Sequence, residues 1–282
     1  MHTQKVWLVT GASKGLGLAL VKKLLAEGYK VAATSRNLPA LTREAGAQSE
    51  NFLPIETDVV NEQSVKEAVE KTIAHFQAID VVVNNAGYGL LGALEELSDE
   101  EARRCFDVNV FGVLNVTRQT MPHFRRQRSG HIFNISSIGG YTAGFPGAGI
   151  YCATKFAVAA LSEGLAAEAS DLNVKATTVY PGYFRTNFLM QGSLQVPENP
   201  IDDYKAARAS LAFHQNEMNG RQPGDPDKAA AVLIKVSEEE NPPLHLFLGE
   251  DAYSRAHAKT EEVKKELEQW KDYTLATSFA VQ

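Results

Sequence analysis

Short runs of β-branched and aromatic residues alternate with longer amphipathic segments along most of this 282-residue chain. That order is typical of βαβ units, in which a crossover helix joins two parallel strands of one sheet. It predicts strands at residues 6–10, 30–34, 52–56, 80–83, 131–135, 174–179 and 244–248, and helices that begin near Gly15, Leu38, Asn61, Ser98, Gly149 and Pro226. We therefore expect an α/β fold with a doubly wound, seven-stranded parallel sheet and helices on both faces.

Two segments fall outside this alternation. Residues 187–224 contain three prolines and lie between the sixth strand and the last predicted helix, with no strand of their own. An insertion of that length is usually a functional lid or a disordered loop. The tail 251–282 contains a charge-rich stretch, Lys259–Lys271, that is typical of a surface helix. The chain is thus expected to have one domain at residues 1–250 and a C-terminal helical extension.

The composition predicts a soluble globular protein with no nucleic-acid or membrane partner. Apolar residues make up 44% of the chain, and the formal net charge of −6 is spread without long blocks of one sign. The short basic run at 125–128 is interpreted as the end of a helix. No apolar stretch approaches the ~18–20 residues of a membrane span, and the strand-like residues 5–9 leave no room for a signal peptide.

Cys105 and Cys152 are the two cysteines of the chain, and neither belongs to a C-x-x-C pair or a histidine cluster. Such cysteine usage fits a reducing compartment and argues against a metal site. We therefore expect a cytoplasmic protein without a bound metal.

A glycine-rich turn follows the first predicted strand and opens the first predicted helix. From Thr10 it reads T-G-A-S-K-G-L-G, with the spacing G-x-x-x-G-x-G rather than the more usual G-x-G-x-x-G. Glycines let the backbone approach a pyrophosphate, which the free N–H groups of a helix N-terminus attract. The turn predicts a dinucleotide site that contains Gly11, Ser13, Lys14, Gly15, Leu16 and Gly17.

The end of the second strand bears on the choice of dinucleotide. An acidic residue normally takes the ribose hydroxyls of NAD there, but this chain has Thr-Ser-Arg-Asn at 34–37. The planar guanidinium group of Arg36 can instead bind a 2′-phosphate, and Lys14 can add a second positive charge. This pattern favours NADP(H), the alternative being that both residues are ordinary surface cations.

Tyr151 and Lys155 lie four residues apart in a predicted helix and therefore share one face of it. A cation within ~4–6 Å favours the phenolate and lowers the pKa of a tyrosine by ~1–3 units, toward the range useful for proton transfer. The pair therefore predicts a proton donor, although a packed aromatic residue is the simpler alternative for Tyr151 alone.

Four motifs occur together and in a fixed order, namely Thr10-Gly11-x-x-x-Gly15-x-Gly17, Asn84-Asn85-Ala86-Gly87, Ser136-Ser137 and Tyr151-x-x-x-Lys155. In this combination the chain resembles the short-chain dehydrogenase/reductases over about residues 5–250. The resemblance implies a Rossmann-type fold and an NADP(H)-dependent enzyme that interconverts a ketone or aldehyde and an alcohol. Under this resemblance the segment 187–224 is a substrate lid.

The resemblance also implies roles for single residues. Tyr151 is then the general acid or base, Lys155 binds the nicotinamide ribose and lowers the pKa of Tyr151, and a serine holds the substrate oxygen. Asn109 helps to anchor a water that leads protons to Lys155. Cofactor contacts are implied for Asp58 and Val59 after the third strand, for Asn85, Ala86 and Gly87 after the fourth, and for Pro181, Gly182, Phe184 and Thr186 after the sixth.

The spacing of the serine departs from the family pattern. The family's serine usually lies thirteen residues before the tyrosine, where this chain has Ile138. Ser137 lies fourteen residues before Tyr151, and the glycine-rich segment between them can absorb one extra residue. We assign Ser137 as the catalytic serine, with Ser136 as the alternative.

The substrate is only broadly indicated. Aromatic and apolar residues that could wall a pocket are Tyr141, Phe145, Tyr183, Phe188, Leu189, Met190, Leu211 and Phe213, of which Phe145, Tyr183 and Phe188 are predicted to contact substrate beside Ser137 and Tyr151. They favour a lipophilic carbonyl compound, unless they only pack the lid. The alternative functions are a non-catalytic NADP(H)-binding regulator or scaffold and a relative of nucleotide-sugar epimerases. Relatives often form homodimers or homotetramers through the helices beginning near Ser98 and Gly149.

Overall fold

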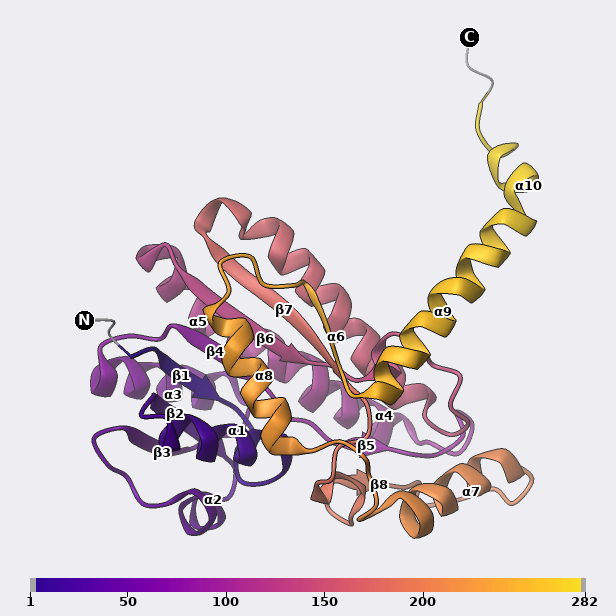
Figure 1. The fold of residues 1–282 in the computed structure, drawn as a ribbon. Coiled ribbons are helices and arrows are strands. Elements are labelled where there is room, and N and C mark those ends of the chain that lie inside the picture. Colours follow the sequence, from indigo (N-terminus) through magenta and orange to yellow (C-terminus); the bar gives the residue numbers. More distant parts are fainter. Residues whose placement is uncertain (1–3, 280–282) are drawn as a thin grey trace.

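The computed structural model describes residues 4–279, and its centre is a sheet of seven parallel strands in the order β3-β2-β1-β4-β6-β7-β9 (Figure 1). The strands are β1 (Val6–Val9), β2 (Lys30–Ser35), β3 (Phe52–Glu56), β4 (Val81–Asn84), β6 (Gly130–Ile135), β7 (Val174–Pro181) and β9 (His245–Leu248). The predicted doubly wound fold is confirmed. Because the strand order reverses between β1 and β4, a crevice forms at the carboxyl ends of these strands.

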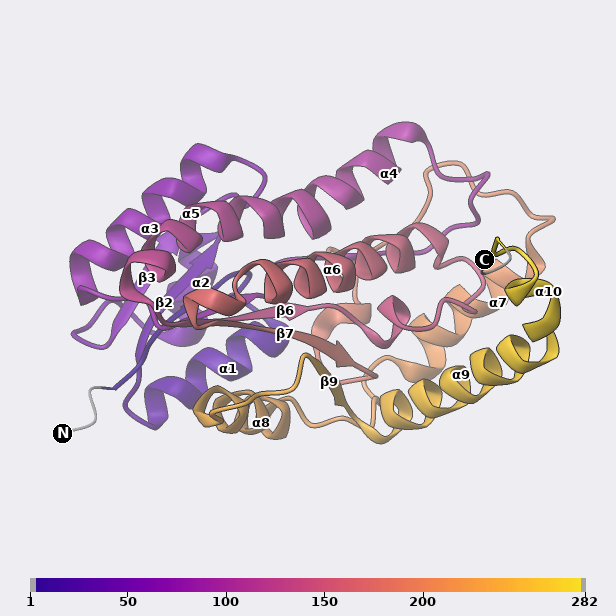
Figure 2. The same cartoon turned by 90° about the horizontal axis from the view of Figure 1, so that it is seen from above.

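Helices cover both faces of the sheet, as Figure 2 shows. The α-helices are α1 (Gly15–Ala26), α2 (Leu38–Ala45), α3 (Glu62–Phe76), α4 (Asp99–Phe106), α5 (Gly112–Gln127), α6 (Gly149–Glu168), α7 (Lys205–Ala212), α8 (Pro226–Glu238), α9 (Glu250–Gln269) and α10 (Lys271–Leu275). Helices α4 and α5 are joined by one π-helical turn, Asp107–Phe111. They form a nearly continuous rod, where the sequence predicts a single helix.

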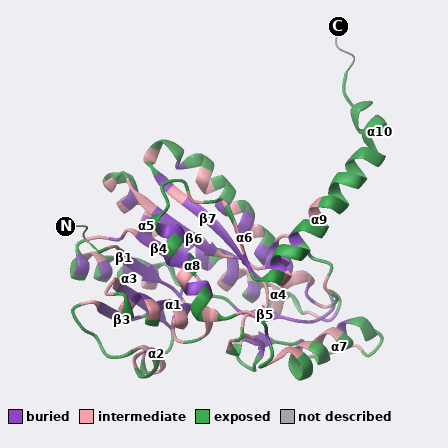
Figure 3. Cartoon of the chain, in the orientation of Figure 1, coloured by how far each residue is buried: buried purple, intermediate pink, exposed green. Residues whose placement is uncertain are grey.

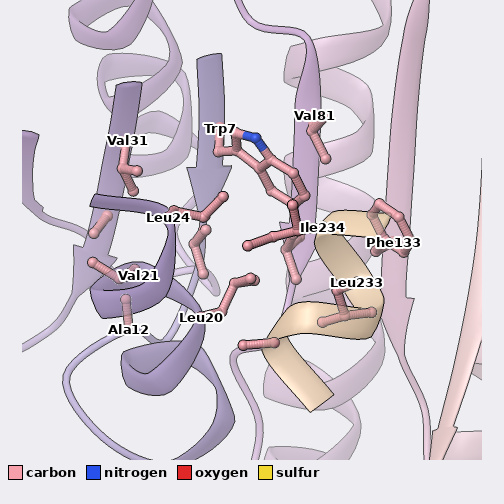
Figure 4. Packing of buried hydrophobic residues seen from close by; sticks show 14 of the residues in the cluster. Trp7, Ala12, Leu20, Val21, Leu24, Val31, Val81, Phe133, Leu233 and Ile234 are labelled. Carbon is pink, nitrogen blue, oxygen red and sulfur yellow. The ribbon is translucent and has the colours of Figure 1, made fainter. Parts of the chain in front are cut away.

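Two apolar layers enclose the sheet because successive side chains of a strand point to opposite faces. On β1, Trp7 packs in the layer beneath α1 and α8, while Leu8 packs in the layer beneath α3 and α5. Figure 4 shows Trp7 beside Leu24 of α1 and Ile234 of α8. The central strands β1, β2 and β4 are buried on both sides, which explains their continuous apolar character in the sequence.

A second, two-stranded parallel sheet pairs β5 (Gly89–Leu90) with β8 (Leu194–Gln195). The prediction that residues 187–224 contain no strand is therefore wrong. Each of these strands is only two residues long, so neither has a periodicity that could be recognised in the sequence. The pairing joins the lid segment to the loop that follows β4.

The lid segment is also held by an ion pair. The side chain of Glu96 is fully buried and accepts hydrogen bonds from the main-chain N–H groups of Ala93 and Ile201, both at 2.6 Å. Its carboxylate also pairs with Arg208 of α7 at 2.5 Å. Because the buried charge is satisfied by three donors, the loop after β5 and the lid helix form one fixed unit.

Helix α9 begins in the body of the protein and then leaves it, as Figure 1 shows. Ala252 and Ala256 are buried against Ile138 and the neighbouring aromatic residues Tyr141 and Phe247. The later part of α9 and all of α10 are largely exposed in Figure 3, which confirms the predicted surface helix. Residues 280–282 of the predicted extension lie outside the described part of the chain.

Helix α6 is long and apolar enough, by length and composition alone, to cross a membrane, with a mean hydropathy of 1.2. The expectation that no segment approaches such a span is therefore wrong. Alanines and single large apolar residues together produce this hydropathy, and Lys155 and Glu163 interrupt the apolar sequence. In the fold α6 contacts β6, β7 and α4 and buries Lys155, as a core helix does.

Candidate active site

A cavity of about 750 Å³ opens at the carboxyl ends of the parallel strands, beside the lid segment. Most of its wall is formed by residues that follow β1, β2, β3, β4, β6 and β7 and by one face of α6, and α9 also contributes to it. Ligands of open α/β sheets bind at this place, and the volume lies within the range of small-molecule sites.

The glycine turn borders one end of the cavity and fits a pyrophosphate. Gly11 has a φ of +64°, and a Cβ there would lie 2.7 Å from the Cα of Ala86, so only glycine fits. The side chain of Asn85 donates to the main-chain oxygen of Gly11 at 3.0 Å and fixes the turn. Helix α1 begins at Gly15 with no hydrogen bond from a capping side chain, which leaves its first N–H groups for a ligand.

All the residues predicted to bind cofactor line the cavity except Gly17. A Cβ on Gly17 would lie 2.4 Å from Asn85 Nδ2, so this glycine packs behind the turn rather than facing the cavity. The carboxylate of Asp58 accepts a hydrogen bond from the N–H of Val60 at 3.1 Å, and Asn61 is the N-cap of α3. The individual cofactor contacts stay predictions.

Lys14 and Arg36 bring two positive charges to the same part of the cavity. Both are exposed, and within residues 4–279 neither lies within ion-pair distance of a carboxylate. Burial and the neighbouring charge of Arg36 lower the pKa of Lys14. The end of β2 carries no acid, and its Ser35 hydroxyl bonds that of Ser13 at 3.0 Å. This end of the cavity is suited to a phosphate group.

Ser137 and Tyr151 meet beside Gly139. A Cβ on Gly139 would lie 3.4 Å from Ser137 Oγ and 3.8 Å from a ring carbon of Tyr151, so both side chains lie next to this glycine. Ser137 caps a 3-10 turn at Ile138–Gly140, which accommodates the extra residue in the serine–tyrosine spacing. The alternative, Ser136, is buried and donates to the main-chain oxygen of Lys155 at 2.8 Å. This geometry favours Ser137.

The net effect of the surrounding protein is to raise the pKa of Tyr151, contrary to the sequence-based expectation. Burial raises the pKa of Tyr151, and the neighbouring Ser137 hydroxyl opposes this only in part. Lys155 Nζ lies 5.8 Å from the ring centroid of Tyr151 and donates to Ile135 O at 2.9 Å. Burial lowers the pKa of Lys155 to about 8. The expectation fails because Tyr151 is partly buried and Lys155 is buried, which favours the neutral form of each.

Asn109 lies in the π-helical turn and is almost fully buried. Its side-chain oxygen accepts from Tyr88 N and its amide donates to Tyr88 O, both at 3.0 Å, and the amide also donates to Thr154 at 3.1 Å. No direct bond joins Asn109 to Lys155, although Gly87 lies beside both. Asn109 therefore positions the loop after β4, and its part in a proton route stays a prediction.

The opposite end of the cavity is largely apolar. Phe145, Tyr183 and Phe188 line it as predicted, and Tyr151 lies 6.1 Å from Phe188 between ring centroids. Buried residues that pack in the same cluster are Leu91, Ala148, Cys152, Leu189 and Leu194. Met190 and Phe213 are instead exposed residues of the lid segment.

Tyr141 does not face the cavity, so its predicted place in the pocket wall is wrong. Its ring packs against Tyr180 and Phe247, and its hydroxyl bonds Thr260 of α9 at 2.9 Å. The 3-10 turn at Ile138–Gly140 directs this side chain toward α9 instead.

Several cavity residues have no sequence signal that could have identified them. Arg255 comes from α9, and His214 and Gln222 come from the lid segment. His214 Nδ1 donates to Ser210 O at 2.6 Å, so its Nε2 accepts from the Tyr183 hydroxyl at 2.9 Å. These residues belong to no motif and reach the cavity only through tertiary packing.

Residues 5–196 match the family model of the short chain dehydrogenases. The chain is 36% identical to the 3-ketodihydrosphingosine reductase of Bacteroides thetaiotaomicron, over 87% of this chain and 88% of that protein. The crystal structure of a short-chain dehydrogenase from Streptomyces avermitilis has a TM-score of 0.89 and 36% identity, covering 99% of this chain and 100% of that one. The protein belongs to the short-chain dehydrogenase/reductase family and is an oxidoreductase.

Structural relatives contain both forms of the nicotinamide cofactor. A 3-ketoacyl-(acyl-carrier-protein) reductase from Brucella melitensis was solved with NADH (TM-score 0.72, 27% identity, covering 86% of this chain and 96% of that one). ElxO was solved with NADP (TM-score 0.73, 28% identity, covering 89% and 100%). The glycine turn and the strand order of this chain agree with an NAD(P)(H) cofactor.

Proposed function

We propose that this protein is an NADPH-dependent carbonyl reductase that acts on a lipophilic ketone or aldehyde. The observation that carries the proposal is the position of Ser137 and Tyr151, which lie in one cavity between the glycine turn and an apolar wall. The Bacteroides relative, a 3-ketodihydrosphingosine reductase, supports a keto substrate.

In this proposal the protein polarises the carbonyl group and supplies a proton. The Ser137 hydroxyl donates a hydrogen bond to the carbonyl oxygen, and Tyr151 transfers its phenolic proton to that oxygen as negative charge develops there. Burial keeps the phenol protonated, which suits reduction. NADPH supplies the hydride when it is bound, and Lys155 positions the cofactor ribose.

The preference for NADPH is supported by the charges near the end of β2. Arg36 and Lys14 both line the cavity, and the end of β2 carries no acidic residue to bind ribose hydroxyls. A 2′-phosphate placed between two such cations forms charge-assisted hydrogen bonds that NADH cannot form.

The proposal is tested by following NADPH absorbance while the purified protein is offered a panel of ketones and aldehydes. We expect turnover with medium-chain or aromatic carbonyls and little with acetone or acetaldehyde, because only large apolar groups bury area against the Phe145 and Phe188 wall. Tight NADPH binding without turnover on any carbonyl would contradict the proposal and favour a non-catalytic regulator.

We further propose that two copies pair through the faces of α4–α5 and α6. Phe111 and Phe156 support this pairing, because they are 51% and 42% exposed in the single chain. In sedimentation velocity, Phe156→Glu is expected to shift the protein toward monomer, since it places a charge in the apolar contact. Leu267→Glu on the projecting helix, where the side chain is 60% exposed, is the matched control. If Leu267→Glu became monomeric and Phe156→Glu did not, the contact between the two copies would instead lie on the projecting helix.

A cytoplasmic location belongs to the same proposal. Cys105 and Cys152 are buried free thiols, as is usual in a reducing compartment. Burial raises the pKa of each thiol to about 11, so neither is present as a reactive thiolate at neutral pH.

A further inference from the structure

Arg255 of helix α9 brings a positive charge to the apolar end of the cavity. It lines the wall with Phe145, Tyr183 and His214, and its guanidinium carbon lies 5.0 Å from the ring centroid of Phe145. The side chain is exposed and stands at the rim, where a ligand in the cavity can reach it.

The position of Arg255 is fixed by the part of α9 that is packed on the body. Ala252 and Ala256 flank it in the sequence and are 0% and 8% exposed. One turn before it, Asp251 accepts a hydrogen bond from the main-chain N–H of Tyr183 at 2.8 Å, which ties the start of α9 to the cavity wall. Arg255 is thus carried by an ordered element rather than by the projecting end of the helix.

Within residues 4–279 the charge of Arg255 has no ion-pair partner. Among residues 4–279 no carboxylate lies within 4 Å of it, and Asp251 is already engaged by Tyr183. The two cavity side chains shown to be near it, Phe145 and Tyr183, are aromatic rings without a negative charge. Burial raises the pKa of Tyr183 while the nearby Arg255 acts to lower it, so the guanidinium is close enough to influence the phenol.

Between Arg255 and the Ser137–Tyr151 pair the cavity wall is apolar. Phe145 packs in one cluster with Tyr151 and Phe188, and the guanidinium lies over this ring. A molecule that fills this space needs a carbonyl at one end, a hydrocarbon or aromatic middle, and a group that satisfies a cation at the other.

We propose that the substrate is an amphiphilic carbonyl compound with an anionic group, a carboxylate or a phosphate ester, which Arg255 binds at the rim of the cavity. This inference rests on the proposed reductase function. The planar guanidinium group can form paired hydrogen bonds with a carboxylate or a phosphate. It repels a substrate that carries an ammonium group at this position.

The test compares positional isomers of oxodecanoic acid with their methyl esters, which differ in charge but hardly in length. For the best isomer we expect kcat/KM to be about tenfold higher for the acid, because only the carboxylate forms charge-assisted hydrogen bonds with the guanidinium. Arg255→Gln should lower kcat/KM for the acid to that of the ester, mainly through KM, and leave the ester unchanged. Arg255→Lys should retain part of the preference, and an oxodecyl phosphate added to the series extends the test to the second anion.

Arg103→Gln is the matched control, because it also removes one positive charge but lies on α4, outside the cavity. In the unmodified protein Arg103 pairs with Asp99 at 2.7 Å. Calorimetric titration of the NADP⁺-saturated protein with decanoate gives a readout without turnover, and the Arg255→Gln variant should bind it about tenfold more weakly. Equal kcat/KM for acid and ester in the unmodified protein, or an equal loss for both in Arg255→Gln, would overturn the inference alone. If the protein reduced none of the acids or esters, and Arg255→Gln left decanoate binding unchanged, both the inference and the proposed function would be contradicted.

Discussion

Replacement of Tyr151 by phenylalanine is expected to lower kcat for carbonyl reduction ~100-fold or more, the lower range for general acid catalysis, while NADPH binds with nearly unchanged affinity. The variant removes only the phenolic hydroxyl and keeps the ring that packs against Phe188 and Cys152. Steady-state kinetics with the best carbonyl substrate, together with a fluorescence titration of NADPH, separates the chemical step from cofactor binding.

Tyr141→Phe is a matched control for this experiment. It also removes one phenolic hydroxyl, but the hydroxyl of Tyr141 bonds Thr260 on α9 and does not reach the cavity. Its kcat should stay within about twofold of the unmodified protein. If Tyr151→Phe kept most of its activity, another group would have to donate the proton, and the assignment of Tyr151 would be wrong.

The sheet and its motif residues could be predicted because their signals are local. Each strand is a short apolar run, and in a parallel sheet the residue after every strand lies at the same edge. Asn85 after β4 and Ser137 after β6 therefore meet the glycine turn of β1 at one cavity, whatever the details of the intervening helices. Local patterns were sufficient for this part of the site.

The substrate end of the cavity could not be predicted because it depends on long-range packing. β8 forms only by pairing with β5, about a hundred residues earlier in the chain, and Glu96 reaches Arg208 across a similar interval. Arg255 faces the cavity only because Ala252 and Ala256 pack on the body. No periodicity or spacing in the sequence reports such contacts.

The pKa of Tyr151 also could not be predicted from the spacing of residues in the sequence. The four-residue spacing correctly places Lys155 near the phenol, with its Nζ 5.8 Å from the ring centroid. Spacing does not report burial, which raises the pKa of Tyr151 and lowers that of Lys155 to about 8. Below that pH Lys155 carries its charge and Tyr151 its proton, which is the combination that carbonyl reduction requires.

Arg36→Asp is expected to shift the ratio of kcat/KM for NADPH over NADH by about 100-fold toward NADH. The substitution removes a guanidinium that would pair with the 2′-phosphate and places a carboxylate at the end of β2, which repels phosphate and can accept hydrogen bonds from ribose hydroxyls. Loss of a charged hydrogen bond accounts for ~1.5–3 kcal/mol, and repulsion adds to it. Initial rates with each cofactor at a fixed carbonyl concentration give the ratio directly.

Two further variants decide whether this effect comes from phosphate recognition at Arg36. Arg43→Ala removes another cation of the same cavity, one that pairs with Glu44 at 3.1 Å, and should leave the ratio unchanged. Lys14→Ala should shift the ratio less than Arg36→Asp, because it removes one charge without adding an opposite one and also breaks the bond from Lys14 to Gly192 O. An unchanged ratio in Arg36→Asp would mean that this residue does not bind phosphate. The preference for NADPH would then have no basis at the end of β2.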